Sequence, residues 1–166
     1  MTFADITTLL QDRFSVTVNT TNAQPYVTVQ AADLVSIGQF LRDDERLFFD
    51  HLACLTAIDN GPANALPVSD TMDVFYNLTS IPYEHDLMLR VTIPRQTASG
   101  ELPTLPTLSH LWRTADWHER EAFDLVGIHF ENHPDLRRIL LPTDWEGHPL
   151  RTDYVEPAYY HGIRNK

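Results

Sequence analysis

Apolar and polar side chains alternate along two stretches in the middle of the chain. Every second residue is apolar in residues 72–78 and again in residues 87–93, which is the pattern of a β-strand with one face against a core. The segment Ile81–His85 between them is short and contains a proline, so we predict that the two strands pair as an antiparallel hairpin. The apolar run of residues 48–58 predicts a further strand, and the segment after it, up to Asp70, predicts a loop.

Regions nearer the N-terminus have helical spacing. The apolar positions of residues 3–14 predict an amphipathic helix that ends near Arg13. Another helix is predicted after Asp33, whose side chain is a candidate N-cap. Residues 14–19 and 26–30 are rich in valine and threonine and predict a hairpin. Together these patterns predict an α+β fold in which helices pack on an antiparallel sheet.

A longer helix is predicted from Ala115 to Val126. At about 3.6 residues per turn its apolar residues share one face, and Glu119 falls in the middle of that face. A carboxylate in that position needs a partner, because burying an isolated charge is costly. Arg120 and Asp124 lie together on the opposite face, which is a candidate surface for a partner protein.

Turn-forming residues follow this helix. Gly127 stands where a helix C-cap is expected, and His133 precedes a proline, which disfavours helical geometry. Arg137 and Arg138 come next, and either is a candidate partner for Glu119 through arginine–carboxylate pairing. We therefore predict a structural network of charged side chains. Its members are Glu119, Arg120, Glu121, Asp124, Arg137 and Arg138.

The pattern changes again from Pro142 onward. Pro, Gly, Trp, His and Tyr dominate there and no periodicity persists. We therefore predict a domain of residues 1–141 followed by an extended C-terminal arm of residues 142–166. Aromatic side chains on an arm without a core are typical of a segment that lies along another protein. The aromatic residues are Trp145, Tyr154, Tyr159 and Tyr160, and the candidate anchors of the arm are His148, Arg151 and Asp153.

Charge and cysteine content narrow the function classes. A formal net charge of -11 argues against nucleic-acid binding and suits either solubility or an acidic docking surface. No apolar run is long enough to span a bilayer. Cys54 is the single cysteine, which excludes a four-cysteine iron–sulfur site and a cysteine-based structural zinc site; we expect it to be buried. The N-terminus has no signal-peptide pattern, as is typical of cytoplasmic synthesis in a prokaryote.

Catalytic and metal-binding patterns are incomplete. His118 and Glu119 begin like a zinc-protease motif, but Ala122 stands where the second histidine is required. His129 and His133 are near each other in sequence, yet the turn that follows is unfavourable for a helical ligand pair. The carboxylates of the helix have no matching nucleophile, and there is no glycine-rich phosphate loop. We expect no catalytic residue, metal or cofactor in this chain.

A dense run of residues in the last third resembles the signature of a known family. It comprises Glu119-Arg120-Glu121, Asp124, Gly127-Ile128, Phe130, His133-Pro134, Leu136-Arg137-Arg138-Ile139, Trp145-Glu146-Gly147-His148-Pro149-Leu150-Arg151 and Asp153-Tyr154. The pattern closely resembles that of the so-called 30 kDa subunit, or C subunit, of proton-pumping NADH:quinone oxidoreductase, which is respiratory complex I. Leu125-Val126 and Thr152 depart from it, since the family usually has Met-Phe and Lys there.

The resemblance implies a role inside a larger assembly. Members of this family belong to the peripheral part of the complex, dock on the quinone-site protein known as the D subunit, near other iron–sulfur subunits, and carry no cofactor. The complex uses FMN and iron–sulfur clusters to pass electrons from NADH to quinone and couples this to proton translocation. The resemblance therefore implies a peripheral position on the cytoplasmic side of a bacterial inner membrane. It also implies partner binding by the signature residues, His133 among them.

Other functions remain open at this point. Similar subunits occur in membrane-bound hydrogenases and in complexes that depend on ferredoxin or coenzyme F420, and the neighbouring subunits would distinguish these. A free-standing acidic binding module is the alternative from a different class. A self-sufficient enzyme is disfavoured, because no set of catalytic residues is complete.

Overall fold

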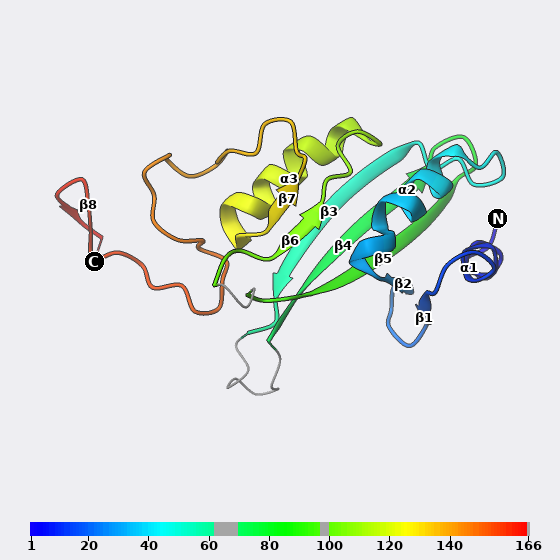
Figure 1. The fold of residues 1–166 in the computed structure, drawn as a ribbon, viewed down its shortest axis with the longest axis horizontal. Helices are drawn as coiled ribbons and strands as arrows, with labels where there is room; N and C mark the ends of the chain where they lie inside the picture. Colours follow the sequence, from blue (N-terminus) through cyan, green and yellow to red (C-terminus); the bar gives the residue numbers. More distant parts are fainter. Residues whose placement is uncertain (62–69, 97–99, 166) are drawn as a thin grey trace.

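A five-stranded sheet forms the centre of this computed structural model, which describes residues 1–61, 70–96 and 100–165 (Figure 1). The strand order is β1-β2-β5-β4-β3. The strands are β1 (Thr17–Asn19), β2 (Tyr26–Val29), β3 (His51–Asp59), β4 (Thr71–Ser80) and β5 (His85–Pro94). Both predicted hairpins, β1 with β2 and β4 with β5, are confirmed as antiparallel pairs. Most of the loop predicted up to Asp70 lies outside the described residues.

One strand pairing adds to the predicted fold class, which is itself confirmed. β2 pairs with β5 in parallel, with Thr28 opposite Arg90. The alternation of side chains along β2 indicates which of its faces is buried. It carries no information about which strand lies beside it, or in which direction that strand runs, so this pairing was not foreseen.

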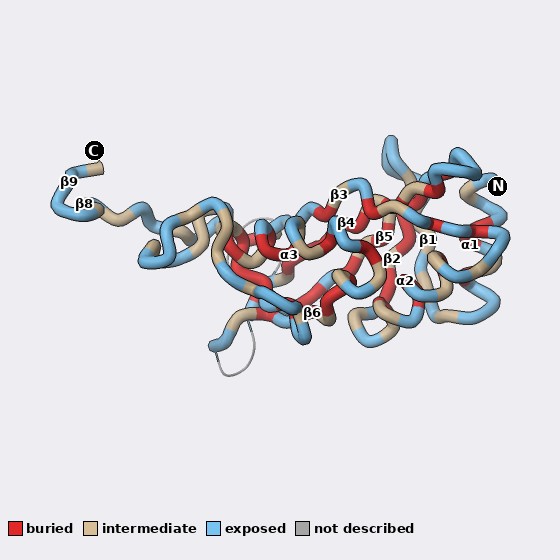
Figure 2. Tube along the Cα trace, turned by 90° about the horizontal axis from the view of Figure 1, so that it is seen from above, coloured by how far each residue is buried: buried red, intermediate tan, exposed pale blue. Residues whose placement is uncertain are grey.

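Helices α2 (Leu34–Asp43) and α3 (Arg113–Val126) cover the apolar face of the sheet (Figure 1). Tyr76 and Leu89 on that face are fully buried, and in Figure 2 the buried positions run through the middle of the molecule. Gly38 lets α2 approach the turn that precedes α3. A β-carbon on Gly38 would stand 2.9 Å from Cδ1 of Leu111, so a larger residue would force the two elements apart.

The N-terminal helices differ in how they begin. Helix α1 (Phe3–Gln11) starts with a capping box in which Thr2 and Asp5 each bind the backbone N–H of the other. The predicted helix after Asp33 exists, but the predicted side-chain cap is wrong. Asp33 belongs instead to a short 3-10 helix, η1 (Ala31–Asp33), and makes no capping hydrogen bond. Because η1 runs directly into α2, the N–H of Leu34, the first residue of α2, donates to the carbonyl oxygen of Ala31 in η1.

Among the residues that the structure describes, no helix covers the second face of the sheet. Its half-exposed residues include Phe75, Met88 and Arg90. Cys54 also lies on this face and is half-buried, so the prediction of a buried cysteine is wrong. The reason is a β-bulge in β3, where the register with β4 shifts between Leu52 and Cys54. The extra residue turns Cys54 away from the core.

The chain after α3 leaves the compact domain. The predicted C-cap is confirmed, because Gly127 ends α3 with φ 78 in the left-handed region. Strand β7 (His129–Glu131) pairs in parallel with β6 (Thr104–Pro106). The remainder extends away from the sheet, and its regular structure is a small hairpin of β8 (Tyr159–Tyr160) and β9 (Ile163–Arg164) (Figure 1). Across the described residues, none of the helices has the length and apolar character needed to cross a membrane.

Candidate docking site on the C-terminal arm

Asp124 on α3 fixes the segment that leads into the arm. Its Oδ2 accepts hydrogen bonds from three successive backbone N–H groups, those of Ile139 (3.0 Å), Leu140 (2.8 Å) and Leu141 (2.9 Å). Its Oδ1 accepts a hydrogen bond from Nη1 of Arg138 at 2.6 Å. Burial acts to raise the pKa of this carboxyl, but the N–H donors and Arg138 outweigh it and lower the pKa. One buried carboxylate thus holds four consecutive residues against the helix.

Arg138 and His148 extend this attachment along the arm. Nη2 of Arg138 donates to the carbonyl oxygen of Gly147 at 2.9 Å. Nδ1 of His148 lies 3.0 Å from the carbonyl oxygen of Asp124, which can only accept, so Nδ1 carries the proton. The backbone N–H of Leu150 donates to the carbonyl oxygen of Leu125 at 2.9 Å. The helix end and the arm are therefore joined at several points.

A second charged cluster ties the arm to the end of the sheet. Asp59 accepts hydrogen bonds from Nε (2.8 Å) and Nη2 (3.1 Å) of Arg95, and both side chains are almost fully buried. The same carboxylate accepts from the backbone N–H (2.9 Å) and the hydroxyl (3.0 Å) of Thr152. Arg95 also contacts Asp153, which in turn pairs with Arg151. Burial acts to raise the pKa of Asp59, yet these hydrogen bonds lower it to about 2.

Sequence reasoning did not predict a role for Asp59 or Arg95. A signal was present, because each is a charged residue at the end of an otherwise apolar strand pattern. β3 and β5 lie on either side of β4, and both are antiparallel to it. Their C-terminal ends therefore lie at the same end of the sheet. The hydroxyl of Thr152, where the family usually has lysine, binds Asp59 in this chain.

Glu119 has partners other than the predicted arginines. It is fully buried, and its carboxylate accepts hydrogen bonds from the backbone N–H of Leu108 (2.7 Å) and the hydroxyl of Thr107 (2.5 Å). The prediction that Arg137 or Arg138 pairs with Glu119 is wrong, because α3 turns Glu119 toward the core while Arg138 binds Asp124 on the other side. Burial raises the pKa of Glu119 to about 7. The two hydrogen bonds act to lower this pKa, and the nearby charge of Asp116 acts to raise it.

His133 closes over this buried carboxylate. Its Nδ1 accepts a hydrogen bond from the backbone N–H of Asp135 at 3.0 Å. Its Nε2 lies 3.1 Å from the carbonyl oxygen of Asp116, so Nε2 carries the proton and the ring is neutral. The same Nε2 lies 3.9 Å from Oε2 of Glu119. His133 therefore joins the turn after β7 to the first turn of α3.

The face of Arg120 and Asp124, which was predicted as a candidate surface for a partner protein, is largely covered by the chain itself, while Trp117 beside it is 62% exposed. Nε of Arg120 donates to the carbonyl oxygen of Arg137 at 3.3 Å, and its guanidinium lies 5.2 Å from the ring of Trp117. The side chain of Arg137 is 72% exposed and pairs with Asp135. Glu121 is exposed and lines a shallow cleft that also includes Leu150.

The aromatic residues of the arm contact one another. Nε1 of Trp145 donates to the hydroxyl oxygen of Tyr154 at 3.1 Å, and its ring lies 5.0 Å from that of Tyr160. The carboxylate of Asp144 accepts from the hydroxyl of Tyr160 at 3.0 Å and lies 2.7 Å from Nε2 of His161. This aromatic cluster orders the distal part of the arm, although most of the arm has no core beneath it (Figure 2).

Apolar side chains along the arm face solvent. Those near or on the arm with large exposed fractions are Leu140 (60%), Leu150 (60%), Val155 (84%), Tyr159 (63%) and Ile163 (71%). Such side chains, held by ordered backbone attachments, are characteristic of a surface that binds a protein. Within residues 1–61, 70–96 and 100–165, no group of three or more His, Cys, Asp or Glu side chains is arranged to hold a metal ion.

Comparison with protein families identifies the fold and the signature together. The model of the family described as respiratory-chain NADH dehydrogenase, 30 Kd subunit, matches residues 27–160, which include most of β2, strands β3, β4 and β5, helix α3 and most of the arm. The chain belongs to this family. The resemblance of the signature residues to those of the 30 kDa subunit of complex I is thereby confirmed.

Curated relatives carry the corresponding names. The C subunit of NADH-quinone oxidoreductase from Chloroherpeton thalassium is 44% identical over 142 residues, which cover 84% of this chain and 54% of the relative. The protein of the same name from Chlorobium phaeobacteroides is 41% identical, and the alignment covers 77% of this chain and 71% of that relative. In Acinetobacter baumannii, the C/D subunit of NADH-quinone oxidoreductase is 43% identical over 81% of this chain and 22% of its own length. The chain thus spans about half the length of the first of these relatives.

Solved structures share the fold. The trypsin-resistant fragment of Nqo5 superposes with a TM-score of 0.61 at 24% identity and covers 82% of this chain and 100% of the fragment. A chain of the membrane-bound sulfane sulfur reductase, an archaeal respiratory membrane complex, superposes with a TM-score of 0.72 at 18% identity. It covers 92% of this chain and 84% of that chain. The α+β architecture is therefore shared beyond recognisable sequence similarity.

Proposed function

We propose that this chain is a docking subunit of the peripheral part of NADH:quinone oxidoreductase, and that its C-terminal arm binds the D subunit. The observation that carries the proposal is the combination on the arm of firm attachment and apolar exposure. Asp124 and Asp59 fix the arm at two separated points, while Val155 and Ile163 remain 84% and 71% exposed. An ordered apolar surface of this kind loses little conformational entropy when a partner covers it.

The relatives support the D subunit as the partner. In Acinetobacter baumannii a sequence similar to this chain makes up part of a protein whose name joins the two letters, C/D. Two subunits joined in one chain are held at high effective concentration, and such joining is favourable where the separate subunits already bind each other. The exposed residues of the arm and the cleft lined by Glu121 and Leu150 offer adjoining surfaces for this contact.

The chain contributes structure rather than chemistry. Three of its buried carboxylates, Asp59, Asp124 and Glu119, all have hydrogen-bond donors from the chain, which suits anchoring and not catalysis. Electron transfer from NADH through FMN and iron–sulfur clusters to quinone, and the coupled proton translocation, would be carried by other subunits. The chain would sit peripherally at the cytoplasmic side of the membrane and would hold those subunits near the quinone site.

Co-purification from the native host tests this proposal. A tagged chain should recover the flavin protein, iron–sulfur proteins and the D subunit from gently solubilised membranes. Val155→Asp should reduce the recovery of the D subunit, because a charge placed in an apolar interface is costly. Ile58→Asp, on the uncovered face of the sheet and 44% exposed, is the matched control. Recovery of the chain alone would favour a free-standing binding module, and recovery of a hydrogenase would favour the related complexes.

A further inference from the structure

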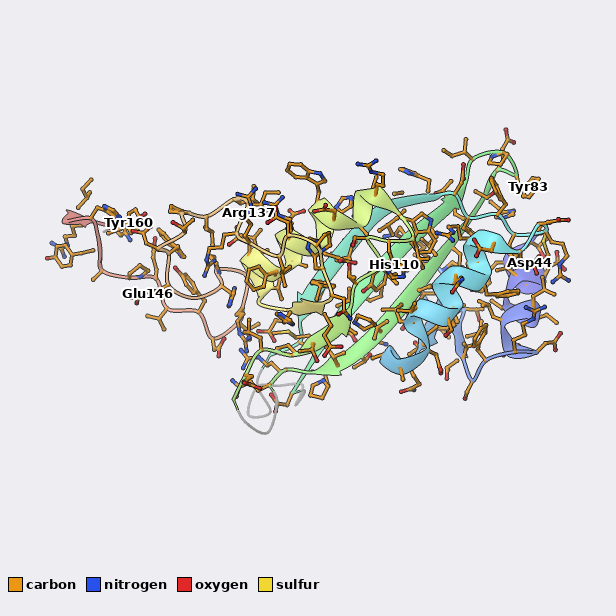
Figure 3. All side chains as sticks on the ribbon, turned by 45° about the horizontal axis from the view of Figure 1, so that its top comes forward. Asp44, Tyr83, His110, Arg137, Glu146 and Tyr160 are labelled. Atoms are coloured by element: carbon orange, nitrogen blue, oxygen red, sulfur yellow. The ribbon has the colours of Figure 1, made fainter. Side chains whose placement is uncertain are left out.

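Three exposed apolar side chains gather at the end of the molecule opposite the arm. Phe48, Ile81 and Tyr83 are 44%, 62% and 48% exposed. The rings of Phe48 and Tyr83 meet edge to face with centroids 6.4 Å apart, and Ile81 belongs to the same turn as Tyr83. We refer to these three residues as the aromatic knob. Tyr83 and the arm residue Tyr160 mark the two ends of the molecule in Figure 3.

The backbone of Phe48 is in a conformation that a bulky residue rarely adopts. Its φ is 41, in the left-handed region. Its two neighbours impose this conformation, since Leu47 and Phe49 are both fully buried. Their N–H groups donate to the carbonyl oxygens of Asp44 and Leu41, respectively. Folding alone would favour glycine or asparagine at this position. A large, exposed aromatic side chain there points to a role outside the fold.

The knob is held rigid by contacts between its two segments. The hydroxyl of Tyr83 donates to the carbonyl oxygen of Glu45 at 2.9 Å. The N–H of Ile81 donates to Oδ1 of Asp50 at 2.9 Å. Nε2 of His85 lies 2.8 Å from the carbonyl oxygen of Leu47. These contacts fix the exposed rings before any partner arrives, which lowers the entropy lost on binding.

Acidic residues surround the knob. The two segments, residues 44–50 and 81–86, contain five carboxylates and one arginine. The arginine, Arg46, is already paired with Asp44 at 2.7 Å. Glu84 adds a second non-glycine residue with positive φ, 52, beside Tyr83. An apolar centre with an acidic rim complements an apolar hollow with a basic rim, and is repelled by an anionic membrane surface.

We propose that the aromatic knob is a second protein-docking surface, which inserts into an apolar hollow rimmed by lysine and arginine on another subunit of the same assembly. The knob lies far from the arm, so this contact is separate from the one proposed for the D subunit (Figure 3). The inference rests on the proposed function only for the existence of an assembly. Two docking surfaces at opposite ends would let the chain bridge neighbouring subunits.

Photo-crosslinking in intact cells of the native host tests the knob and the arm separately. Position 48 and, in a second strain, position 159 are replaced by p-benzoylphenylalanine, and the adducts are identified as peptides after irradiation. The proposal expects a position-48 adduct with one other subunit, in a peptide flanked by lysine or arginine. No protein adduct, or one with a second copy of this chain, overturns it. An adduct between position 159 and the D subunit tests the proposed function independently.

The variant Phe48→Gly separates binding from folding. Glycine suits the positive φ, so the melting temperature of the purified chain should stay level or rise. The amount of chain retained in the solubilised assembly should fall roughly tenfold, as it does when an aromatic hot spot is lost. A lower melting temperature with unchanged assembly would show that Phe48 serves the fold and would overturn the proposal. Glu45→Lys should lower the yield of the position-48 adduct, because it reverses one charge of the acidic rim.

Discussion

The ring of His148 occupies the space where a β-carbon on Gly127 would lie. Such an atom would stand 2.6 Å from Cδ2 of the imidazole, and Gly127 also has φ 78. The glycine therefore serves two purposes, since it ends α3 in the left-handed conformation and leaves room for the histidine that attaches the arm. The two residues are distant in sequence but form one contact between the domain and the arm.

Gly127→Ala should loosen the arm. The added methyl group must displace His148, and alanine is strained at the positive φ of this position. We therefore expect a loss of about 2–3 kcal/mol in the free energy of unfolding. Chemical denaturation measures the loss, and limited trypsin digestion at Arg151 reports the release of the arm. Gly162→Ala is the control, because Gly162 also has positive φ, 79, but nothing lies within 4 Å of its β-carbon position. Equal effects of the two substitutions would contradict the packing role of His148.

Asp124→Asn should be strongly destabilising. The amide of asparagine keeps the shape of the side chain but leaves Arg138 without its carboxylate. It also presents either an NH2 group or a weaker acceptor to the N–H donors of residues 139–141. Breaking a buried ion pair on one side costs about 3–5 kcal/mol. Denaturant unfolding measures the change, and Asp135→Asn, whose carboxylate is half-exposed and pairs with Arg137, should change stability little. A small effect of Asp124→Asn would rule out the hub role of this residue.

Glu119 should make stability fall as pH rises. Its pKa is raised by burial from 4.5 to about 7, so the folded state binds the proton more tightly than the unfolded state. The stabilisation is complete below pH 4.5 and is lost as pH rises toward about 7, and its size is on the order of 3 kcal/mol. Asp116, His133 and Tyr76 face the same carboxyl.

Glu119→Gln provides the comparison for that pH dependence. The amide cannot ionise, so its unfolding free energy measured between pH 5 and pH 8 should vary less than that of the unchanged chain. Glu121→Gln, on the exposed side of α3, should keep the original pH profile. Identical profiles for the unchanged chain and Glu119→Gln would contradict the raised pKa of Glu119.

Asp59 should act in the opposite direction at low pH. Hydrogen bonds from Arg95 and Thr152 outweigh the effect of burial and lower its pKa from 3.8 to about 2. The folded state therefore binds the proton less tightly, and the stabilisation is present above pH 3.8 and is lost as pH falls toward 2. Unfolding measured between pH 2 and pH 6 should show that Asp59→Asn loses part of this acid dependence.

Thr152→Val tests the arm contact of the same cluster. It removes the hydroxyl donor to Asp59 and keeps the backbone N–H donor, so we expect a loss of about 1 kcal/mol. Thr143→Val, at an exposed position of the arm, is the control for the substitution itself. An unchanged stability in Thr152→Val would indicate that the backbone N–H alone anchors this part of the arm.

Periodicity predicted the elements because it records burial. The alternation in β4 and β5 and the spacing around Ala115 and Val126 each follow from one side of an element facing the core. The same reasoning failed at Cys54, where a bulge exchanges the two faces without any mark in the composition. The prediction of an N-cap at Asp33 also failed, because Asp33 belongs to the 3-10 helix η1, which leads directly into α2.

The sequence by itself determined the fold class, the central hairpin, the end of α3 at Gly127 and, through the signature residues, the family. These properties depend on local spacing or on residue identity, which one chain displays directly. The tertiary structure alone decided which charges pair. Arg138 binds Asp124 and not Glu119, and Asp59 binds Arg95 and Thr152 across 36 and 93 residues of sequence. A charged side chain attracts any opposite charge, so its charge alone does not determine its partner. The partner is determined by which faces come together when the elements pack.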